Sequence, residues 1–523
     1  MISLRKIIKK EWFWLGIVIL TAGFLYFYKL GQWQYLNYDQ ARDYLIIKRL
    51  IINHKLTLIG PSLGILDGGY QPPLYYYLLA PSFLISGFHI WGPDALTAII
   101  SLTSLVVFYF VARDFFGKIP ALAGSLIYAL NPYMIQAARH ARNPHWLPIF
   151  VLLFLFSFKK YLLDKKRKFL LIASLSLAAA ISLHVTAIVF LPFWIYLIYR
   201  DWRQFKISRR LIVSLACFSI FFAPLILFVF RHDFLMAKAV LNFFTPKDNS
   251  SIWQIFLRIG RLAIFFFKIP LIFFAGLYQK ELLSLRSLPL ASLDKVNFFG
   301  LKNFEFIKLI LSAGLSGLLM VALLDNLRKR NNLYCLLGAF IFAGFAVSLM
   351  CPPDGSFLYY FYNLFPFLLL LFSGAIAWWL KKSQKLPLLL YLSIFWAIMP
   401  LFPNGLKTEI RPESYFAPVS ELIAKDAGQN EKIAVAANVK ESARWEKNAL
   451  EYRYFLEAIY RMPPTAWDAA GYQQANVLYL IDEKGETEPL KIGGMEMEAF
   501  EPKKIVKVWE AKTGQKIYKL LKN

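Results

Sequence analysis

Eleven apolar segments within the first 403 residues are each long enough to cross a bilayer. The hydrocarbon layer is about 30 Å thick, and an α-helix satisfies its backbone N–H and C=O groups internally, so each segment predicts a transmembrane helix. The segments lie near residues 12–28, 92–112, 120–138, 144–159, 169–184, 185–199, 211–230, 306–324, 333–350, 361–380 and 386–402. Of the 523 residues, 58% are hydrophobic and 18% are charged, which excludes a soluble globular enzyme and a disordered chain. We therefore predict an all-α polytopic membrane protein with about 11 transmembrane helices.

The net charge of +26 belongs to this apolar part. Residues 404–523 hold 18 basic and 18 acidic side chains, whereas residues 1–403 hold 41 basic and 15 acidic ones. No basic patch with interleaved aromatic residues stands out, so we expect no nucleic-acid partner. If the N-terminus is cytoplasmic, the cytoplasmic loops collect 23 basic and five acidic residues, in agreement with the positive-inside rule. We expect a multi-pass protein of the cell (plasma) membrane.

Two segments do not fit a simple span. Residues 72–91 are rich in Pro and Tyr, and residues 252–278 are interrupted by Arg258, Arg261 and Lys268. If either segment alone crossed the membrane, every later loop would move to the opposite side of the membrane and the positive-inside pattern would be lost. We predict interfacial or re-entrant helices on the outer face, where aromatic side chains and long cations are stable.

The composition changes after Pro403 to alternating polar and apolar residues. We divide the chain into a transmembrane domain, residues 1–403, and a soluble exoplasmic α/β domain, residues 404–523. An odd number of spans places this second domain outside the cell. Its pattern predicts helices near 416–427 and 452–460, and strands near 432–439, 477–481, 505–509 and 516–521.

Polar groups that could perform chemistry gather on the predicted outer face. Nucleotide-binding, zinc and hydrolase signatures are absent from the sequence. All six histidines fall in outer loops or at outer helix ends: His54, His89, His140, His145, His184 and His232. Either imidazole simply favours the membrane interface, or these residues belong to a shared exoplasmic site.

Asp39 and Asp43 lie four residues apart at the start of a predicted helix, residues 39–53, and therefore share one face of it. One interpretation is that a carboxylate here caps the helix N-terminus. The other is that one of them is a general base that removes the proton of an acceptor hydroxyl.

A second outer loop places Arg139, His140 and Arg142 just beyond a span. These arginines either anchor to lipid headgroups or bind a phosphate or diphosphate, which the planar guanidinium group suits well. Four further residues complete the predicted outer-face set of substrate-binding donors: His184, Arg231, Tyr359 and Tyr360.

In these motifs the chain resembles GT-C superfamily glycosyltransferases of the type that includes protein O-mannosyltransferases and lipid A aminoarabinose transferases. The resemblance covers most of residues 1–403. It is carried by Tyr38-Asp39-Gln40 after the first span, GYQPPLYYYLLAPSFLISG, ALNPYMIQAARHARNPHWLP, LHVTA, and the Tyr-Tyr pair before Pro366.

The family pattern carries its catalytic Asp onto Asp39. Three positions depart from that pattern: Gln40 stands where many members have a second acid, Asn143 where relatives often have an acid, and Gln71 where some keep a phosphate-binding base. The resemblance then assigns phosphate binding to Arg139, Arg142, Arg231 or His184. A divalent metal is left open as a cofactor.

The resemblance implies transfer of a sugar from a polyprenyl-phosphate donor to an acceptor hydroxyl on the outer face. The expected partners are this lipid-linked donor, membrane lipid, and an acceptor glycan, lipid or protein. Two alternatives stay open: a polysaccharide polymerase or ligase with diphosphate-linked donors, and a transporter or flippase of lipid-linked substrates.

Overall fold

The computed structural model describes residues 10–63, 68–236, 238, 252–275, 303–349, 358–383, 411–428, 430–440, 446–486 and 488–522. The predicted span 386–402 and the predicted domain boundary at residues 403 and 404 lie outside these ranges. The chain forms two compact units. The membrane unit comprises Met1–Tyr28, Thr57–Leu78 and Asp94–Lys407, and the α/β unit comprises Lys29–Leu56, Leu79–Pro93 and Thr408–Asn523.

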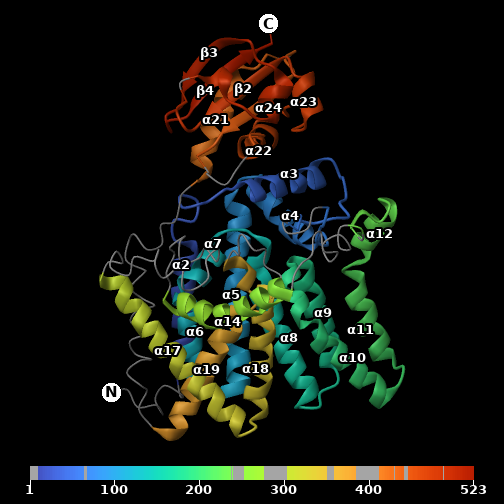
Figure 1. Ribbon diagram of the computed structural model, residues 1–523, viewed down its shortest axis with the longest axis vertical. Helices are drawn as coiled ribbons and strands as arrows, with labels where there is room; N and C mark the ends of the chain where they lie inside the picture. The colour runs from blue at the N-terminus through green and yellow to red at the C-terminus, as the bar shows by residue number, and fades with distance from the viewer. Residues whose placement is uncertain are drawn as a thin grey trace. The chain divides into compact units, whose positions relative to one another are not determined.

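The described part of the membrane unit is helical (Figure 1). Its helices are α2 (Glu11–Phe27), α5 (Trp91–Phe116), α6 (Lys118–Leu130), α7 (Pro132–Arg139), η1 (Asn143–Trp146), α8 (Leu147–Leu162), α9 (Phe169–Leu183), η2 (Val185–Phe190), α10 (Leu191–Phe205), α11 (Arg209–Ile220), α12 (Ala223–Arg231), α14 (Ile252–Ala275), α17 (Asn303–Arg328), α18 (Asn332–Phe345), η3 (Ala346–Leu349), η4 (Leu358–Phe361) and α19 (Phe365–Lys382).

Five helices in the described residues are long and apolar enough to cross a membrane, or six if the bent pair of α11 and α12 forms one span. Several other predicted spans are shorter helices, among them α2, α9 and α18. The predicted span 120–138 is broken into α6 and α7 at Asn131, whose side chain accepts hydrogen bonds from Tyr133 and Met134 N–H groups. Pro132 then opens α7, where its missing N–H costs nothing. The predicted eleven spans are therefore not confirmed by the described helices.

Both segments that did not fit a simple span form helices. Residues 252–278 contain α14, which runs crosswise to the neighbouring helices α18 and α19 in Figure 1. Residues 72–91 contain α4 (Leu74–Ser86), and the division between the two units falls within this helix.

Ion pairs tie together the loops that the charge pattern predicts to be cytoplasmic. All five acidic residues of these loops pair with basic residues of the same set of loops. The pairs are Glu11 with Arg113 and Lys118, Asp114 and Asp164 with Lys159 and Lys160, Asp201 with Arg167, and Asp325 with Lys329 and Lys382. Since an ion pair requires proximity, these contacts support the prediction that the loops share one end of the membrane unit.

The α/β unit contains a four-stranded sheet in the order β1-β2-β4-β3. Its strands are β1 (Ile433–Asn438), β2 (Val477–Asp482), β3 (Lys504–Glu510) and β4 (Lys516–Leu521), and its helices are α21 (Glu413–Asp426), α22 (Leu450–Ala458), α23 (Ala469–Gln474) and α24 (Met495–Phe500). The pair β1 and β2 is parallel and the other two pairs are antiparallel. The four predicted strands and both predicted helices are present in the structure. Alternation of apolar residues indicated the strands, and helical periodicity indicated the helices.

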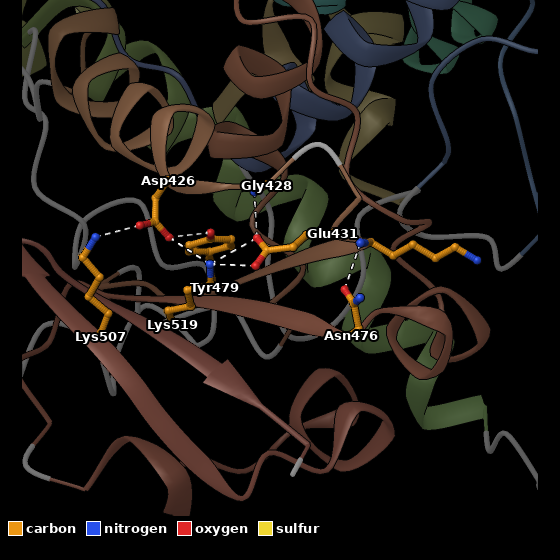
Figure 2. A network of polar contacts seen from close by, with 8 residues as sticks. Asp426, Gly428, Glu431, Asn476, Tyr479, Lys507 and Lys519 are labelled. Carbon is orange, nitrogen blue, oxygen red and sulfur yellow. Dashed lines mark hydrogen bonds and ion pairs between the residues drawn. The ribbon is translucent and has the colours of Figure 1, made fainter.

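The two faces of the sheet carry different contacts because side chains alternate along each strand. Leu478 and Leu480 of β2 pack with residues of α23 and α24 in an apolar core. On the opposite face, Asp426 at the end of α21 accepts hydrogen bonds from Tyr479 Oη at 2.9 Å, Lys507 Nζ at 2.7 Å and Lys519 Nζ at 3.1 Å (Figure 2). This polar network joins α21 to strands β2, β3 and β4.

A helix that the sequence predicts in the first outer loop belongs to the α/β unit. This helix is α3 (Tyr38–Ile52), and it packs against α22. Buried Tyr44 contacts the ring of Tyr454 with centroids 5.6 Å apart, and Glu457 lies 3.5 Å from the side-chain nitrogens of Lys48 and Arg49. The domain division predicted from the sequence places this helix in the transmembrane domain, residues 1–403. In the structure it packs against α22, which follows residue 404.

Candidate functional site

The first turn of α3 carries Asp39, and the structure shows what caps this helix. Asn37 is the N-cap: its side chain accepts a hydrogen bond of 3.0 Å from the Gln40 N–H, and the Gln40 side chain accepts one of 3.3 Å from the Asn37 N–H. This reciprocal capping box satisfies the orphan donors of the helix end. Asp39 is therefore not the N-cap residue.

Arg42 brings the two predicted carboxylates together. Its guanidinium group lies 3.2 Å from Asp39 Oδ1 and 3.0 Å from Asp43 Oδ1. The two acids differ in exposure, because the side chain of Asp39 is 71% exposed and that of Asp43 is 8% exposed. Asp39 is thus the carboxylate that an incoming molecule can reach, while Asp43 holds Arg42 from the buried side.

In the membrane unit, Arg139 ends α7 and is buried. Its Nη1 donates hydrogen bonds to the backbone carbonyls of Leu25 at 2.8 Å and Tyr26 at 3.3 Å, near the end of α2. Asp94, in the first turn of α5, accepts a hydrogen bond of 2.9 Å from the Ala141 N–H. These contacts attach the second predicted outer loop to α2 and α5.

The residues of this loop differ in burial. His140 is buried, and this burial lowers its pKa well below the usual value, an effect to which His145, Arg142 and Arg139 add by charge repulsion. The imidazole is therefore neutral at physiological pH. Arg142 is half-buried and is the more accessible of the two arginines.

Imidazole and phenol rings gather around η1 and η4. His145 lies against Tyr362 with ring centroids 4.9 Å apart. His184, between α9 and η2, lies 6.0 Å from Tyr359 and 5.7 Å from Tyr360 by the same measure. Both of these tyrosines are half-buried. The late Tyr-Tyr pair and the LHVTA segment, far apart in sequence, therefore meet in the structure.

Asn143 connects this cluster to the interfacial segment. Its Nδ2 donates hydrogen bonds to the Leu183 carbonyl at 2.7 Å and to Gln71 Oε1 at 3.3 Å. Two of the three positions that depart from the family pattern are thus in contact with each other. Both side chains of this contact are uncharged amides.

Arg231 stands apart from the other predicted binding residues. It is exposed at the end of α12. The same helix reaches the interfacial segment through Phe228, whose ring lies 5.6 Å from that of Tyr70. Arg231 thus lies on the exposed surface of the membrane unit.

The structure consequently divides the predicted site residues between the two units. Asp39 and Asp43 lie in the α/β unit, and the membrane unit holds Arg139, His140, Arg142, His184, Arg231, Tyr359 and Tyr360. Among the residues that the structure describes, no group of three or more His, Cys, Asp or Glu side chains could hold a metal ion.

Sequence reasoning did not single out Asp94 or Lys268 as site residues. A carboxylate at the start of an apolar helix was the available signal for Asp94. Lys268 is a half-buried cation on α14, one turn after Phe265, whose ring lies 5.7 Å from that of Phe361. Within the described ranges, Lys268 forms no ion pair.

Two solved structures of GT-C glycosyltransferases share this fold. ArnT from Cupriavidus metallidurans bound to undecaprenyl phosphate matches with a TM-score of 0.59 and 13% identity, over 97% of this chain and 98% of that one. The Archaeoglobus fulgidus oligosaccharyltransferase in complex with Zn and sulfate matches with a TM-score of 0.51 and 13% identity, over 97% of this chain and 72% of that one. The chain therefore shares its fold with these two proteins.

Sequence comparison adds a family match over part of the chain. Residues 70–228 match the model of the Dolichyl-phosphate-mannose-protein mannosyltransferase family. A comparison with curated proteins finds no match. The matched range holds Gln71, Asp94, Arg142 and His184, so it includes most of the cluster described above. The resemblance predicted from the sequence is confirmed, and the chain is a multi-pass membrane protein.

Proposed function

We propose that this protein transfers a sugar from a polyprenyl-phosphate donor to an acceptor hydroxyl on the outer face of the membrane. The observation that carries the proposal is the state of Asp39. It is an exposed carboxylate at a helix start that Asn37 already caps, and Arg42 orients it. The family match over residues 70–228 supports the choice of a glycosyltransferase.

The donor phosphate is assigned to the membrane unit. Arg142 supplies a half-buried guanidinium group, and the same unit holds His184 in contact with the rings of Tyr359 and Tyr360. Arg139 is already bonded to two backbone carbonyls, so its role in the proposal is to hold the loop that carries Arg142. The ArnT structure contains undecaprenyl phosphate, which supports a polyprenyl-linked donor for a chain of the same fold.

The reaction is a displacement at the anomeric carbon of the sugar. Asp39 accepts the proton of the acceptor hydroxyl, and the oxygen forms a bond to the anomeric carbon. The bond between that carbon and the phosphate oxygen breaks, and polyprenyl phosphate leaves with the electron pair. The cationic and hydroxyl groups stabilise the leaving phosphate. The acceptor is a glycan, a lipid or a protein.

A turnover assay tests this proposal. The purified full chain in nanodiscs is given a panel of polyprenyl-phosphate sugars with candidate acceptors, and release of polyprenyl phosphate is measured. Asp39→Asn should lower the rate by about 100-fold or more, because the amide cannot accept the proton. Asp43→Asn should lower the rate less, since Asp43 is buried behind Arg42.

A matched control uses an aspartate in the same unit with a known structural role. Asp468 caps α23 by accepting a hydrogen bond from Gly471 N–H at 2.8 Å. Because Asn caps as well as Asp, Asp468→Asn should retain wild-type turnover. Near-normal turnover of Asp39→Asn would remove the general base from the mechanism. Turnover only with diphosphate-linked donors would favour a polymerase or ligase, and donor movement across the bilayer without release would favour a flippase.

A further inference from the structure

The residue next to Asp39 joins α3 to the C-terminal region of the chain. Tyr38 Oη donates a hydrogen bond to the Glu446 carboxylate. Asn448 Nδ2 lies 3.1 Å from the same carboxylate oxygen and 3.4 Å from Tyr38 Oη. Burial, reinforced by the bond to Glu446, raises the pKa of Tyr38 to about 12, so its hydroxyl remains a donor at neutral pH.

The chain leading into α3 is held by a second contact with the same region. The Arg411 N–H donates to the Gln34 carbonyl at 2.9 Å, and the Leu36 N–H donates to the Arg411 carbonyl at 3.0 Å. The guanidinium group of Arg411 in turn lies 3.0 Å from Glu483 and 3.7 Å from Glu451, both of them buried. This short backbone pairing is therefore anchored inside the C-terminal fold.

These contacts hold the chain before, at and after the first turn of α3. Arg411 holds the residues before Asn37, Tyr38 is tied to Glu446, and Tyr44 packs on Tyr454 one turn and a half further along the helix. Asp39 lies between these points. Its backbone position is thus set by residues from the far end of the sequence.

We propose that Tyr38 and Glu446 are positioning residues that fix Asp39 for the transfer reaction, so that the C-terminal region is a working part of the transferase site. The inference rests on the proposed role of Asp39. A group that must meet an acceptor hydroxyl within hydrogen-bond reach tolerates little displacement. Loss of the Tyr38 hydroxyl would loosen the turn without touching the carboxylate of Asp39.

The test compares Tyr38→Phe, Glu446→Ala and Glu446→Gln in the full chain. Tyr38→Phe and Glu446→Ala should each lower kcat by about 10- to 100-fold, because small misplacements of a reacting group cost rate, while KM for the donor stays unchanged. Glu446→Gln retains a carbonyl oxygen that accepts the bond, and should recover most of kcat. The double variant Tyr38→Phe/Glu446→Ala should be no slower than Glu446→Ala alone, since each single change already removes the bond between Tyr38 and Glu446.

The control variant is Tyr460→Phe. It removes a hydroxyl that donates to the Ala417 carbonyl at 3.1 Å elsewhere in the same unit, and kcat should stay at the wild-type value. Additive losses in the double variant, or a wild-type kcat in Tyr38→Phe, would refute the positioning role even where Asp39→Asn is inactive.

Hydrogen exchange separates this inference from the proposed activity. In Tyr38→Phe, the amides of Gln40 and Ala41 should exchange faster, because their helical turn opens more often. If the exchange rates of these amides do not change, the contact between Tyr38 and Glu446 does not constrain α3. If the wild-type protein releases no polyprenyl phosphate with any donor, the proposed function fails, and the exchange rates still decide whether Tyr38 and Glu446 hold the turn.

Discussion

The buried carboxylate of Asp94 accepts a hydrogen bond of 2.9 Å from the backbone N–H of Ala141, across 47 residues of sequence. Ala141 lies between His140 and Arg142, so this one bond sets the course of the chain between two predicted binding residues. Burial lowers the pKa of Arg139, and the charge of Asp94 opposes this shift. The second outer loop therefore depends on an acidic side chain from a different helix.

Removal of this carboxylate should change donor binding. Asp94→Ala should raise the donor KM and lower the stability of the protein by about 1.5–3 kcal/mol, the usual contribution of a hydrogen bond to a charged group. Asp94→Asn retains an accepting oxygen and should be milder. Thr97→Val is the control, since it deletes the bond of 3.1 Å from Trp146 Nε1 to Thr97 on the same helix. A control that raises the donor KM as much as Asp94→Ala would contradict this assignment.

Substitutions of the two arginines of this loop, Arg139 and Arg142, should have different effects. Arg139→Ala should lower the melting temperature more than Arg142→Ala, because it leaves the buried carbonyls of Leu25 and Tyr26 without their donor. Arg142→Ala should raise the donor KM with little change in melting temperature. Titration of polyprenyl phosphate into each variant measures this difference. Equal donor affinity of Arg142→Ala and wild type would return Arg142 to a role at the lipid headgroups.

Acid should weaken the part of the polar network in Figure 2 that is centred on Asp426. Burial opposes ionisation of this carboxyl, but the hydrogen bonds from Lys507, Lys519 and Tyr479 outweigh it and hold its pKa below the usual value. A carboxyl with a lowered pKa in the folded state stabilises above its unfolded pKa of about 3.9 and loses that contribution as the pH falls through the folded value. The protection factors of the β3 and β4 amides, which correct for the intrinsic pH dependence of exchange, should therefore fall below about pH 4 in wild type. Asp426→Asn should exchange fast already at neutral pH and show a flatter pH dependence.

The orientation of the chain is a separate prediction. The excess of basic residues in one set of loops predicts a cytoplasmic N-terminus and an exoplasmic region after residue 404. Alkaline phosphatase fused after Pro403 should be active, and a green fluorescent protein at the same position should be dark in an oxidising exoplasm. The opposite pair of results would reverse the orientation and the face on which donor and acceptor meet.

Local sequence signals predicted the elements of the α/β unit well. Strands β1 to β4 and helix α3 could be predicted because alternation and helical periodicity depend on neighbouring residues alone. The capping of α3 could also have been predicted, since Asn37 followed by Gln40 three positions later is the pattern of a capping box. The break at Asn131-Pro132 carried a similar signal within an apolar run.

Contacts between segments that lie far apart in the chain could not be predicted from the sequence. The partners of Arg139 are backbone carbonyls of α2, and no side-chain pattern indicates a carbonyl acceptor. The assignment of α3 to the same unit as α22 depends on packing of Tyr44 and on the pairs of Glu457, which link segments about 400 residues apart. Candidate site residues could thus be proposed from the sequence, while the contacts that hold them in place could not.

The bond between Tyr38 and Glu446 also sets an order of events at the ribosome. The two residues are 408 positions apart. At ~5–20 residues per second, about 20–80 s pass between the synthesis of the first and that of the second. During this interval the buried face of α3, with Tyr44 and Ile47, has no α22 to pack against. Packing of the helix that carries Asp39 is consequently a late step of biogenesis, and under the proposed function we expect nascent chains to gain activity only after the C-terminal region has folded.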